Sequence, residues 1–305
     1  MKIRFWGARG SIPTPGQSTV YYGGNTACIE ICYGSNRRII VDAGTGIKPL
    51  GDTIARNELS AGPVKARIFL SHTHWDHIMG FPFFTPIFIP GTELDIYSPV
   101  TYEDESIESV FGFQLSYRYF PIRQSELAAR IVYHELKEET IELEDGMRVT
   151  TKFLNHPVLC LGYRFEFDGK VFCTCYDTEP FRNVFPEDPA DPDYDESAAE
   201  EGKAAAREEN RKILRFHHGA DAVVYDTQYT EQEYRQSRIG WGHTSYEYAI
   251  KACHNTAVKR LYFFHHDPAR SDDELGALIE GYRNAIAGKS MLQIDAAREG
   301  LEIEL

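Results

Sequence analysis

SHTHWDHIMG, residues 71–80, places three histidines and an aspartate within six positions of a chain that has eleven histidines in all. The stretch directly follows the apolar run IFL, so we expect it to leave the end of a buried strand and open a short helix. Imidazole and carboxylate groups are ligands for zinc, iron and manganese. His72 and His74 stand two residues apart and can face one point, whereas Asp76 and His77 can face a second. The pattern therefore predicts two metal ions roughly 3.5–4 Å apart, with Trp75 turned away to pack.

The segments around this stretch alternate between strand-like and helix-like patterns. Short runs rich in β-branched and aromatic residues predict strands at 2–6, 25–34, 37–44, 64–72, 130–136, 147–155, 162–167, 170–177, 221–226 and 260–266. Helical spacing of apolar residues predicts helices at 45–58, 244–255 and 272–287. Strands that lead through polar loops into helices are typical of an α/β protein whose site lies at the strand ends.

Two segments interrupt this alternation. Residues 81–125 are aromatic-rich and irregular, and we interpret them as an insert that covers the site, contacts a second subunit or forms a small satellite core. Residues 186–212 carry ten acids and four bases, which predicts an exposed loop running into a solvated helix. We expect a single domain over residues 1–305 that contains both inserts.

Composition limits the classes of partner. The chain has 305 residues and a formal net charge of −14, which argues against binding an extended nucleic acid backbone. A small anionic substrate remains compatible with that charge, because metal ions can supply local positive charge. The sequence has no long apolar stretch and no signal-peptide pattern, so we expect a cytoplasmic protein that does not enter a membrane. Its six cysteines do not form a disulfide framework and are interpreted as buried, reduced thiols.

The motif THWDH with its preceding strand, together with GARGSIPTPG (7–16) and IIVDAGTG (39–46), resembles the metallo-β-lactamase superfamily. The resemblance spans nearly the whole chain and is greatest to the phosphodiesterase branch, which includes tRNase Z and cyclic-nucleotide phosphodiesterases. It implies an αββα sandwich of the metallo-β-lactamase type, with the metal site at the edge of the two sheets.

The resemblance also implies the remaining metal ligands. His156 in FLNHPV matches the third-motif histidine, and Asp177 in TCYDTEP matches the carboxylate that bridges two cations. The late histidine falls in LYFFHHDP, where we favour His265 over His266. One ion is then expected to be bound by His72, His74, His156 and Asp177, and the other by Asp76, His77, Asp177 and His265. Two Zn²⁺ ions are expected, with Mn²⁺ or Fe²⁺ as alternatives, and a bridging hydroxide would be the nucleophile.

A second pattern resembles the phosphodiesterase branch more specifically. GWGHTSYEYA (240–249) places His243 just before a helix, where the branch has a histidine that donates a proton to the leaving oxygen. Asp226 matches the acidic residue that orients this histidine, so we predict Asp76, His243 and Asp226 as catalytic residues. Taken alone, His243 would be interpreted as a surface histidine near a helix start.

Three further residues have weaker interpretations. Asp42 and Asn25 are expected to brace the metal-binding loops. Arg9 in the GARG loop either contacts a phosphate or is an ordinary exposed-loop arginine.

The sequence therefore predicts a dinuclear metal-dependent phosphodiesterase acting on a small phosphodiester, with a cyclic nucleotide as the expected substrate. Alternatives are a tRNA 3′-processing endonuclease of the tRNase Z type, another hydrolase of the same fold, an iron oxidoreductase, or a degenerate member that only binds nucleotides or a protein. The inserts are aromatic or acidic rather than basic, which counts against gripping of tRNA. A homodimer is a further hypothesis.

Overall fold

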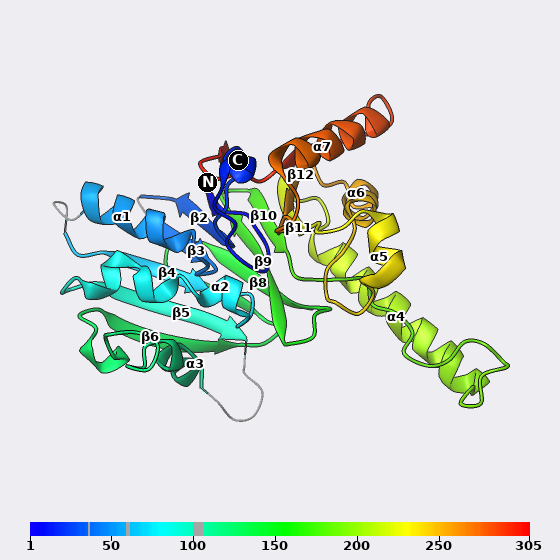
Figure 1. The fold of residues 1–305 in the computed structure, drawn as a ribbon, viewed down its shortest axis with the longest axis horizontal. Helices are drawn as coiled ribbons and strands as arrows, with labels where there is room; N and C mark the ends of the chain where they lie inside the picture. Colours follow the sequence, from blue (N-terminus) through cyan, green and yellow to red (C-terminus); the bar gives the residue numbers. More distant parts are fainter. Residues whose placement is uncertain (36, 59–61, 100–105) are drawn as a thin grey trace.

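The computed structural model describes residues 1–305 except 36, 59–61 and 100–105. Within these residues the chain forms two seven-stranded sheets, each of which carries helices on its outer face (Figure 1). The αββα layers expected from the sequence are therefore confirmed. None of the described helices is both long and apolar enough to cross a membrane.

The first sheet is built mainly from the N-terminal half of the chain. Its order is β14 (Glu302–Glu304), β1 (Lys2–Gly7), β2 (Cys28–Tyr33), β3 (Arg37–Val41), β4 (Lys65–Phe69), β5 (Glu93–Pro99) and β6 (Arg130–Leu136). Strands β3 to β6 are parallel, so their carboxyl ends meet at one edge of the sheet. The outer face is covered by α1 (Ile47–Asn57), the short α2 (Trp75–Ile78) and α3 (Ile107–Gln114).

The second sheet is built from the C-terminal half. Its order is β13 (Gln293–Ala296), β12 (Arg260–Phe264), β11 (Ala222–Asp226), β10 (Lys170–Cys175), β9 (Cys160–Phe167), β8 (Arg148–Leu154) and β7 (Thr140–Glu142). Strands β10 to β13 are parallel. The helices of this half are α4 (Glu196–Phe216), α5 (Glu231–Ser237), α6 (Tyr246–Asn255) and α7 (Asp272–Ile286).

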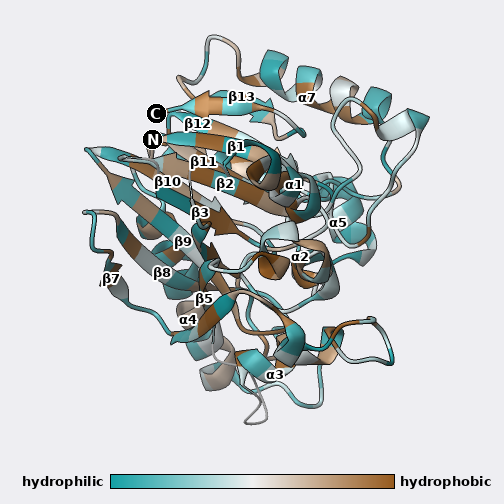
Figure 2. Cartoon of the chain, turned by 90° about the vertical axis from the view of Figure 1, so that its left-hand side faces the viewer, coloured by the Kyte–Doolittle hydropathy of each residue, from teal (hydrophilic) through white to brown (hydrophobic). Residues whose placement is uncertain are grey.

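The alternation of side chains along each strand divides the apolar core into layers. In β10, Phe172 faces the layer between the sheets, whereas Cys173 and Cys175 face the layer under the helices. The apolar colouring of the stacked strands and the polar outer turns of α7 follow the same division (Figure 2). All six cysteines are free thiols, as expected, and five of them are buried.

The two interrupting segments differ in how far they fit their sequence interpretation. The irregular reading of residues 81–125 is wrong for 93–99, because these residues form β5, which lies between β4 and β6 in the first sheet. Neighbouring Phe-Pro turns obscure the alternation of apolar and polar side chains along this strand. Residues 100–105, which also belong to the expected insert, lie outside the described part of the chain. Residues 186–212 contain a loop and most of α4, which projects from the body as a long helix (Figure 1). The single-domain organisation with two inserts stays a prediction.

Candidate metal and phosphodiester site

The candidate site lies where strands from both sheets end. His72 follows β4, His156 follows β8, Asp177 follows β10 and His265 follows β12, so residues distant in sequence arrive at one edge. Asp177 and His265 both have positive φ angles, 55° and 59°. Such backbone is uncommon outside glycine and is held by surrounding structure, often at functional sites.

The structure brings the two predicted ligand sets together. The potential ligand atoms of His72, His74, His156 and Asp177 lie within 4.8 Å of one another. The same holds for the set of Asp76, His77, Asp177 and His265. Asp177 belongs to both sets, which is the position a bridging carboxylate requires. Their role as metal ligands stays a prediction.

The choice between the two late histidines is decided by where their rings point. The Nε2 atom of His265 lies 3.0 Å from Asp76 Oδ2 and 3.4 Å from Asp177 Oδ2. His266 instead donates from Nε2 to the carbonyl oxygen of Ala297 at 2.8 Å. Of these two, His265 therefore belongs to the cluster.

The donor set fits divalent cations. The buried atoms His72 Nε2, His77 Nε2 and Asp177 Oδ1 have no hydrogen-bond partner among the described residues, although buried polar atoms are rarely left unpaired. His156 Nε2 and His74 Nδ1 face each other at 3.0 Å, as two nitrogen lone pairs directed at one cation would. The superfamily suggested by the sequence normally binds metals, and this cluster has the chemistry to do so.

Electrostatics favour metal binding as well. Burial lowers the pKa of His72 well below its ordinary value and that of His156 to about 4, which keeps both imidazoles in the neutral form that binds metals. Burial opposes protonation of His77, but the carboxylates of Asp177, Asp76 and Asp42 raise its pKa well above the usual range. The negative charge that raises this pKa is the charge that would attract a cation.

A buried network braces the histidines from behind. Asp42, at the end of β3, accepts hydrogen bonds from His77 Nδ1 at 2.6 Å and from the backbone and hydroxyl of Ser71 at 2.6 and 2.8 Å. A carboxylate behind a histidine fixes the tautomer that leaves Nε2 free for a metal. The backbone N–H of Ser11 donates to Asp76 Oδ2 at 2.8 Å, which positions that carboxylate from the opposite loop. Ser71 and Ser11 were not singled out in the sequence, although each lies in a quoted motif.

His243 and Asp226 lie beside the cluster. His243 Nδ1 donates to Asp226 Oδ2 at 2.7 Å, and the His243 ring stacks on His265 with centroids 4.7 Å apart. Burial alone would lower the pKa of His243, but the Asp226 carboxylate raises it to about 9. An imidazole oriented in this way can hold a proton beside a reacting phosphate.

Two further predicted residues have structural roles. Asn25 Nδ2 donates to Glu299 at 3.1 Å, while the Asn25 carbonyl accepts from Ala8 and Arg9, so Asn25 braces the GARG loop. Both interpretations of Arg9 are wrong: its side chain is fully buried and donates to carbonyl oxygens of Gly23, Asp267 and Arg270. The sequence could not show this burial, because the segment that covers the loop is more than 250 residues away in the chain.

The expectation that Trp75 packs is also wrong. Its side chain is 66% exposed, because the single turn of α2 buries Asp76, His77 and Ile78 and leaves Trp75 on the outer side.

The loop before His243 is held by a residue that the sequence did not indicate. The buried Glu179 accepts hydrogen bonds from the backbone N–H groups of Gly240 and Gly242 at 2.9 and 3.1 Å. The carbonyl of Gly242 in turn accepts from His156 Nδ1 at 3.0 Å. Glu179 therefore connects the GWG turn to the cluster. Its position two residues after Asp177 is the signal that could have indicated it.

The sequence profile of the metallo-beta-lactamase superfamily matches residues 21–163, which include the four ligand-type residues of the opening motif and His156. This match lies on a chain whose layers and strand-end site are those of that fold. The domain of the metallo-β-lactamase superfamily is therefore present over residues 21–163 of this chain. Together with the curated relatives below, this match identifies the chain as a hydrolase of that superfamily.

Curated relatives agree with this assignment. A ribonuclease Z from Lactococcus lactis is 25% identical over 295 residues, which cover 87% of this chain and 88% of the relative. A ribonuclease BN from Proteus mirabilis is 35% identical over 107 residues, which cover 34% of this chain and 32% of the relative.

Solved structures share the fold. YhfI from Bacillus subtilis superimposes with a TM-score of 0.63 at 16% identity and covers 100% of this chain and 98% of its own. The short form of human tRNase Z has a TM-score of 0.61 at 16% identity, covering 100% and 99%. A diphosphatase of the PhnP family has a TM-score of 0.60 at 16% identity, covering 100% and 97%.

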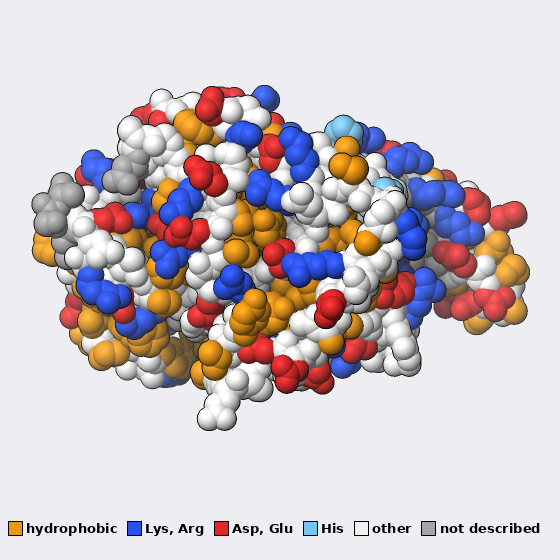
Figure 3. All heavy atoms as spheres, turned by 90° about the horizontal axis from the view of Figure 1, so that it is seen from above, with side chains coloured by type: hydrophobic (Ala, Val, Ile, Leu, Met, Phe, Trp, Pro, Cys, Tyr) orange, Lys and Arg blue, Asp and Glu red, His pale blue; other side chains and the backbone are white. Residues whose placement is uncertain are grey.

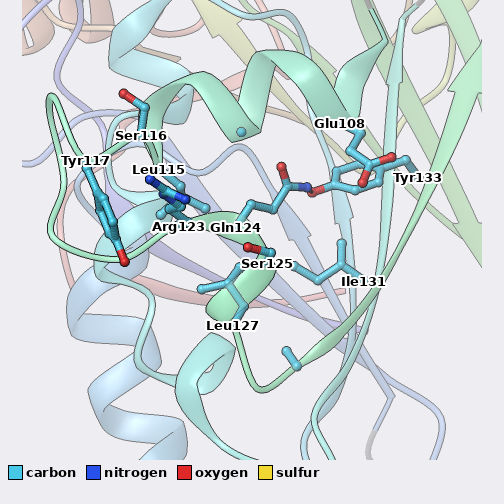
Figure 4. A pocket seen from close by; sticks show the side chains of 12 residues that line it. Glu108, Leu115, Ser116, Tyr117, Arg123, Gln124, Ser125, Leu127, Ile131 and Tyr133 are labelled. Carbon is cyan, nitrogen blue, oxygen red and sulfur yellow. Dashed lines mark hydrogen bonds between the residues drawn. The ribbon is translucent and has the colours of Figure 1, made fainter.

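A separate cavity of about 630 Å³ lies between α3 and β6 (Figure 4). Two of its polar side chains are engaged by neighbours: Gln124 Nε2 donates to Tyr133 at 3.0 Å, and the Arg123 guanidinium lies 4.2 Å from the Tyr117 ring centroid. None of its lining residues belongs to the histidine–aspartate cluster. The chemistry therefore points to the cluster rather than to this cavity.

Proposed function

We propose that the protein is a dinuclear metal-dependent phosphodiesterase that hydrolyses a small phosphodiester, with a cyclic nucleotide as its substrate class. The observation that carries the proposal is the His243–Asp226 pair beside the cluster, since a phosphodiester needs both charge neutralisation and a proton for its leaving oxygen. Two divalent ions, most simply Zn²⁺, would neutralise the phosphate charge and activate water when bound.

The side chains divide this work between them. One ion would be held by His72, His74 and His156, the other by Asp76, His77 and His265, with Asp177 shared between the two. Asp42 holds His77 in the tautomer that presents Nε2 to the site.

The proton is held by a different residue. His243 carries it on Nε2 and gives it to the departing alkoxide, while Asp226 fixes the ring and stabilises its charged form.

Charge favours a small substrate over a long nucleic acid. The net charge is −14, and on the face seen from above in Figure 3 basic and acidic side chains are interspersed. Continuous phosphate-backbone binding relies on clustered Lys and Arg. A homodimer remains part of the proposal, to be measured by light scattering.

A second candidate function is tRNA 3′ processing of the tRNase Z type. It is favoured by the names of the relatives, which include a ribonuclease Z that aligns with 87% of this chain. The histidine–aspartate cluster could serve either phosphodiester hydrolysis or tRNA processing, so the substrate distinguishes the two functions.

The test is a substrate panel on metal-loaded protein with its metal content measured. We expect hydrolysis of bis-(p-nitrophenyl) phosphate and of a 2′,3′- or 3′,5′-cyclic nucleotide, and loss of both in Asp177→Asn. Protein that holds two metal ions yet cleaves no phosphodiester contradicts the proposal. Selective hydrolysis of tRNA precursors supports the second function instead.

A further inference from the structure

Three large apolar side chains stand exposed around the cluster. Ile12, Trp75 and Trp241 are 55%, 66% and 55% exposed. Each is tied to the cluster through an immediate neighbour: Ser11 donates to Asp76, Trp75 lies between His74 and Asp76, and Trp241 precedes Gly242, whose carbonyl accepts from His156. Exposed apolar groups gathered beside a polar site are typical of ligand contact.

The backbone on either side of Trp241 is also held in place. Gly240 and Gly242 on either side of it have φ angles of 87° and 79°, a conformation that strongly favours glycine. The Glu179 carboxylate accepts from both of their N–H groups and from the hydroxyl of Tyr234 at 2.8 Å. The turn that carries the indole is thus held at two backbone N–H groups by a carboxylate that Tyr234 fixes in turn, which reduces the entropy lost when a ligand binds.

A series of side-chain contacts links Trp241 to His243. The Arg238 guanidinium carbon lies 4.6 Å from the Trp241 ring centroid and 5.6 Å from that of Tyr229. The Tyr229 ring lies 6.3 Å from the His243 ring. Arg238 forms no ion pair among the described residues, so its charge is free to act on an anionic ligand. Trp241 is therefore linked to His243 through Arg238 and Tyr229.

We infer that Trp241, backed by Arg238, binds the nucleobase of a single nucleotide whose phosphodiester reaches the cluster at His243. This inference rests on the proposed function and adds the residues that bind the base of the substrate. Bases stack on aromatic side chains with little regard to sequence, and loss of one such ring typically weakens binding about ten-fold or more. Trp241 is then a specificity residue, and Glu179 is a positioning residue that acts through the turn.

The first test measures binding without turnover. Calorimetry compares 5′-AMP with ribose 5-phosphate on metal-loaded wild-type protein, Trp241→Ala and Trp241→Phe. We expect wild type to bind AMP about ten-fold more tightly than ribose 5-phosphate, Trp241→Ala to lose this preference, and Trp241→Phe to keep most of it. Wild type without the preference, or Trp241→Ala with all of it, overturns the inference.

The chain offers a matched control. Tyr117 is also an exposed aromatic residue with an arginine, Arg123, over its ring, but it lies at the α3 cavity (Figure 4). Tyr117→Ala should leave the AMP preference unchanged. An equal loss in Tyr117→Ala would show that the effect is not specific to the GWG turn and overturns the inference.

The second test uses catalysis. Trp241→Ala should raise KM for 2′,3′-cyclic AMP about ten-fold and leave the base-free methyl riboside 2′,3′-cyclic phosphate unchanged. Equal losses on both substrates, or a loss confined to tRNA precursors, overturn the inference. If wild type cleaves no phosphodiester, the proposed function fails, and the AMP binding preference still decides the inference.

Discussion

Asp226 orients His243 and is the main cause of its raised pKa, to which Asp177 and Asp76 also contribute. Asp226 is fully buried at the end of β11, and besides His243 it accepts hydrogen bonds from the backbone N–H groups of Thr178 and Gln228. Two backbone N–H groups therefore hold the Asp226 carboxylate in place, and the carboxylate in turn orients the His243 ring. In the proposed mechanism His243 acts on the leaving oxygen and is not one of the metal ligands.

Replacing His243 should therefore separate metal binding from proton donation. We expect His243→Asn to retain both metal ions and to lower kcat by roughly 10²–10⁴-fold on a substrate with an alkoxide leaving group. The loss should be much smaller on bis-(p-nitrophenyl) phosphate, because p-nitrophenolate departs without a proton. Metal analysis and steady-state kinetics check this, with exposed His254→Asn as the control. Equal losses on both substrates would refute the role of proton donor.

His217 gives stability a pH dependence that is independent of the metal site. The side chain is fully buried, and its Nδ1 atom lies 3.0 Å from the Thr256 hydroxyl. Burial lowers the pKa of His217 to about 4. His217 binds a proton more readily in the unfolded chain than in the folded one, so acid favours unfolding. The stability of the fold is therefore unaffected by this histidine above about pH 6.5 and decreases as pH falls toward 4.

We expect His217→Gln to weaken the loss of stability between pH 6.5 and 4, by up to about 3 kcal/mol. Urea unfolding of both proteins at several pH values measures this difference. The neighbouring His218 is exposed, so His218→Gln should follow the wild-type pH dependence. Parallel curves for His217→Gln and wild type would contradict the expectation.

At the scale of elements, helix starts connect stability to the site. Ser245 is the N-cap of α6, where its hydroxyl accepts from Tyr248 N–H at 3.2 Å and donates to Glu231 at 2.6 Å. His243 lies two residues earlier, so this cap also fixes the chain that carries the proposed proton donor. Ser271 caps α7 in a similar way through Glu274.

Ser245→Ala should lower the free energy of unfolding by about 1–2 kcal/mol and also reduce kcat. Ser271→Ala should cost about 1 kcal/mol and leave kcat unchanged, because α7 carries no predicted site residue. Thermal unfolding and kinetics on both variants make the comparison. Loss of activity in both, in proportion to stability, would show that Ser245 acts on the fold alone.

Elements also show how far sequence patterns extend. The strand runs that end in His72, Asp177 and Asp226 were predicted because each is a short apolar run followed by a polar residue. β5, β7, β13, β14, α3 and α5 were not predicted. β5 has seven residues but lies beside Phe-Pro turns, whereas β7, β13 and β14 have three or four residues each. β14 is stabilised by pairing with β1, some 300 residues earlier in the chain, rather than by a pattern of its own.

At the scale of the whole molecule, the cluster joins the two sheets. Its side chains come from the end of β4 in the first sheet and from the ends of β8, β10 and β12 in the second. Metal ions at this edge would connect the sheets and offset the repulsion between Asp76 and Asp177. Binding and global stability should therefore be linked.

Removing metal with a chelator should lower the Tm, and adding Zn²⁺ or Mn²⁺ should restore it. An ion present at 100 times its Kd contributes about 2.7 kcal/mol to the folded state. Asp177→Asn, which lacks the shared carboxylate, should show a smaller shift on chelation. Calorimetry with metal analysis tests this, and an unchanged Tm after complete metal removal would contradict it.

The sequence by itself determined which donor types the site contains and where along the chain they stand, because ligand chemistry and strand-to-loop transitions are local properties. Tertiary structure decided which side chains from distant segments join those of SHTHWDHIMG. It placed His265, which the resemblance favoured, in the cluster and turned His266 away. It also buried Arg9, left Trp75 exposed and held the GWG turn with Glu179. These outcomes depend on contacts between segments tens to hundreds of residues apart, and only the packing of the two sheets brings those segments together.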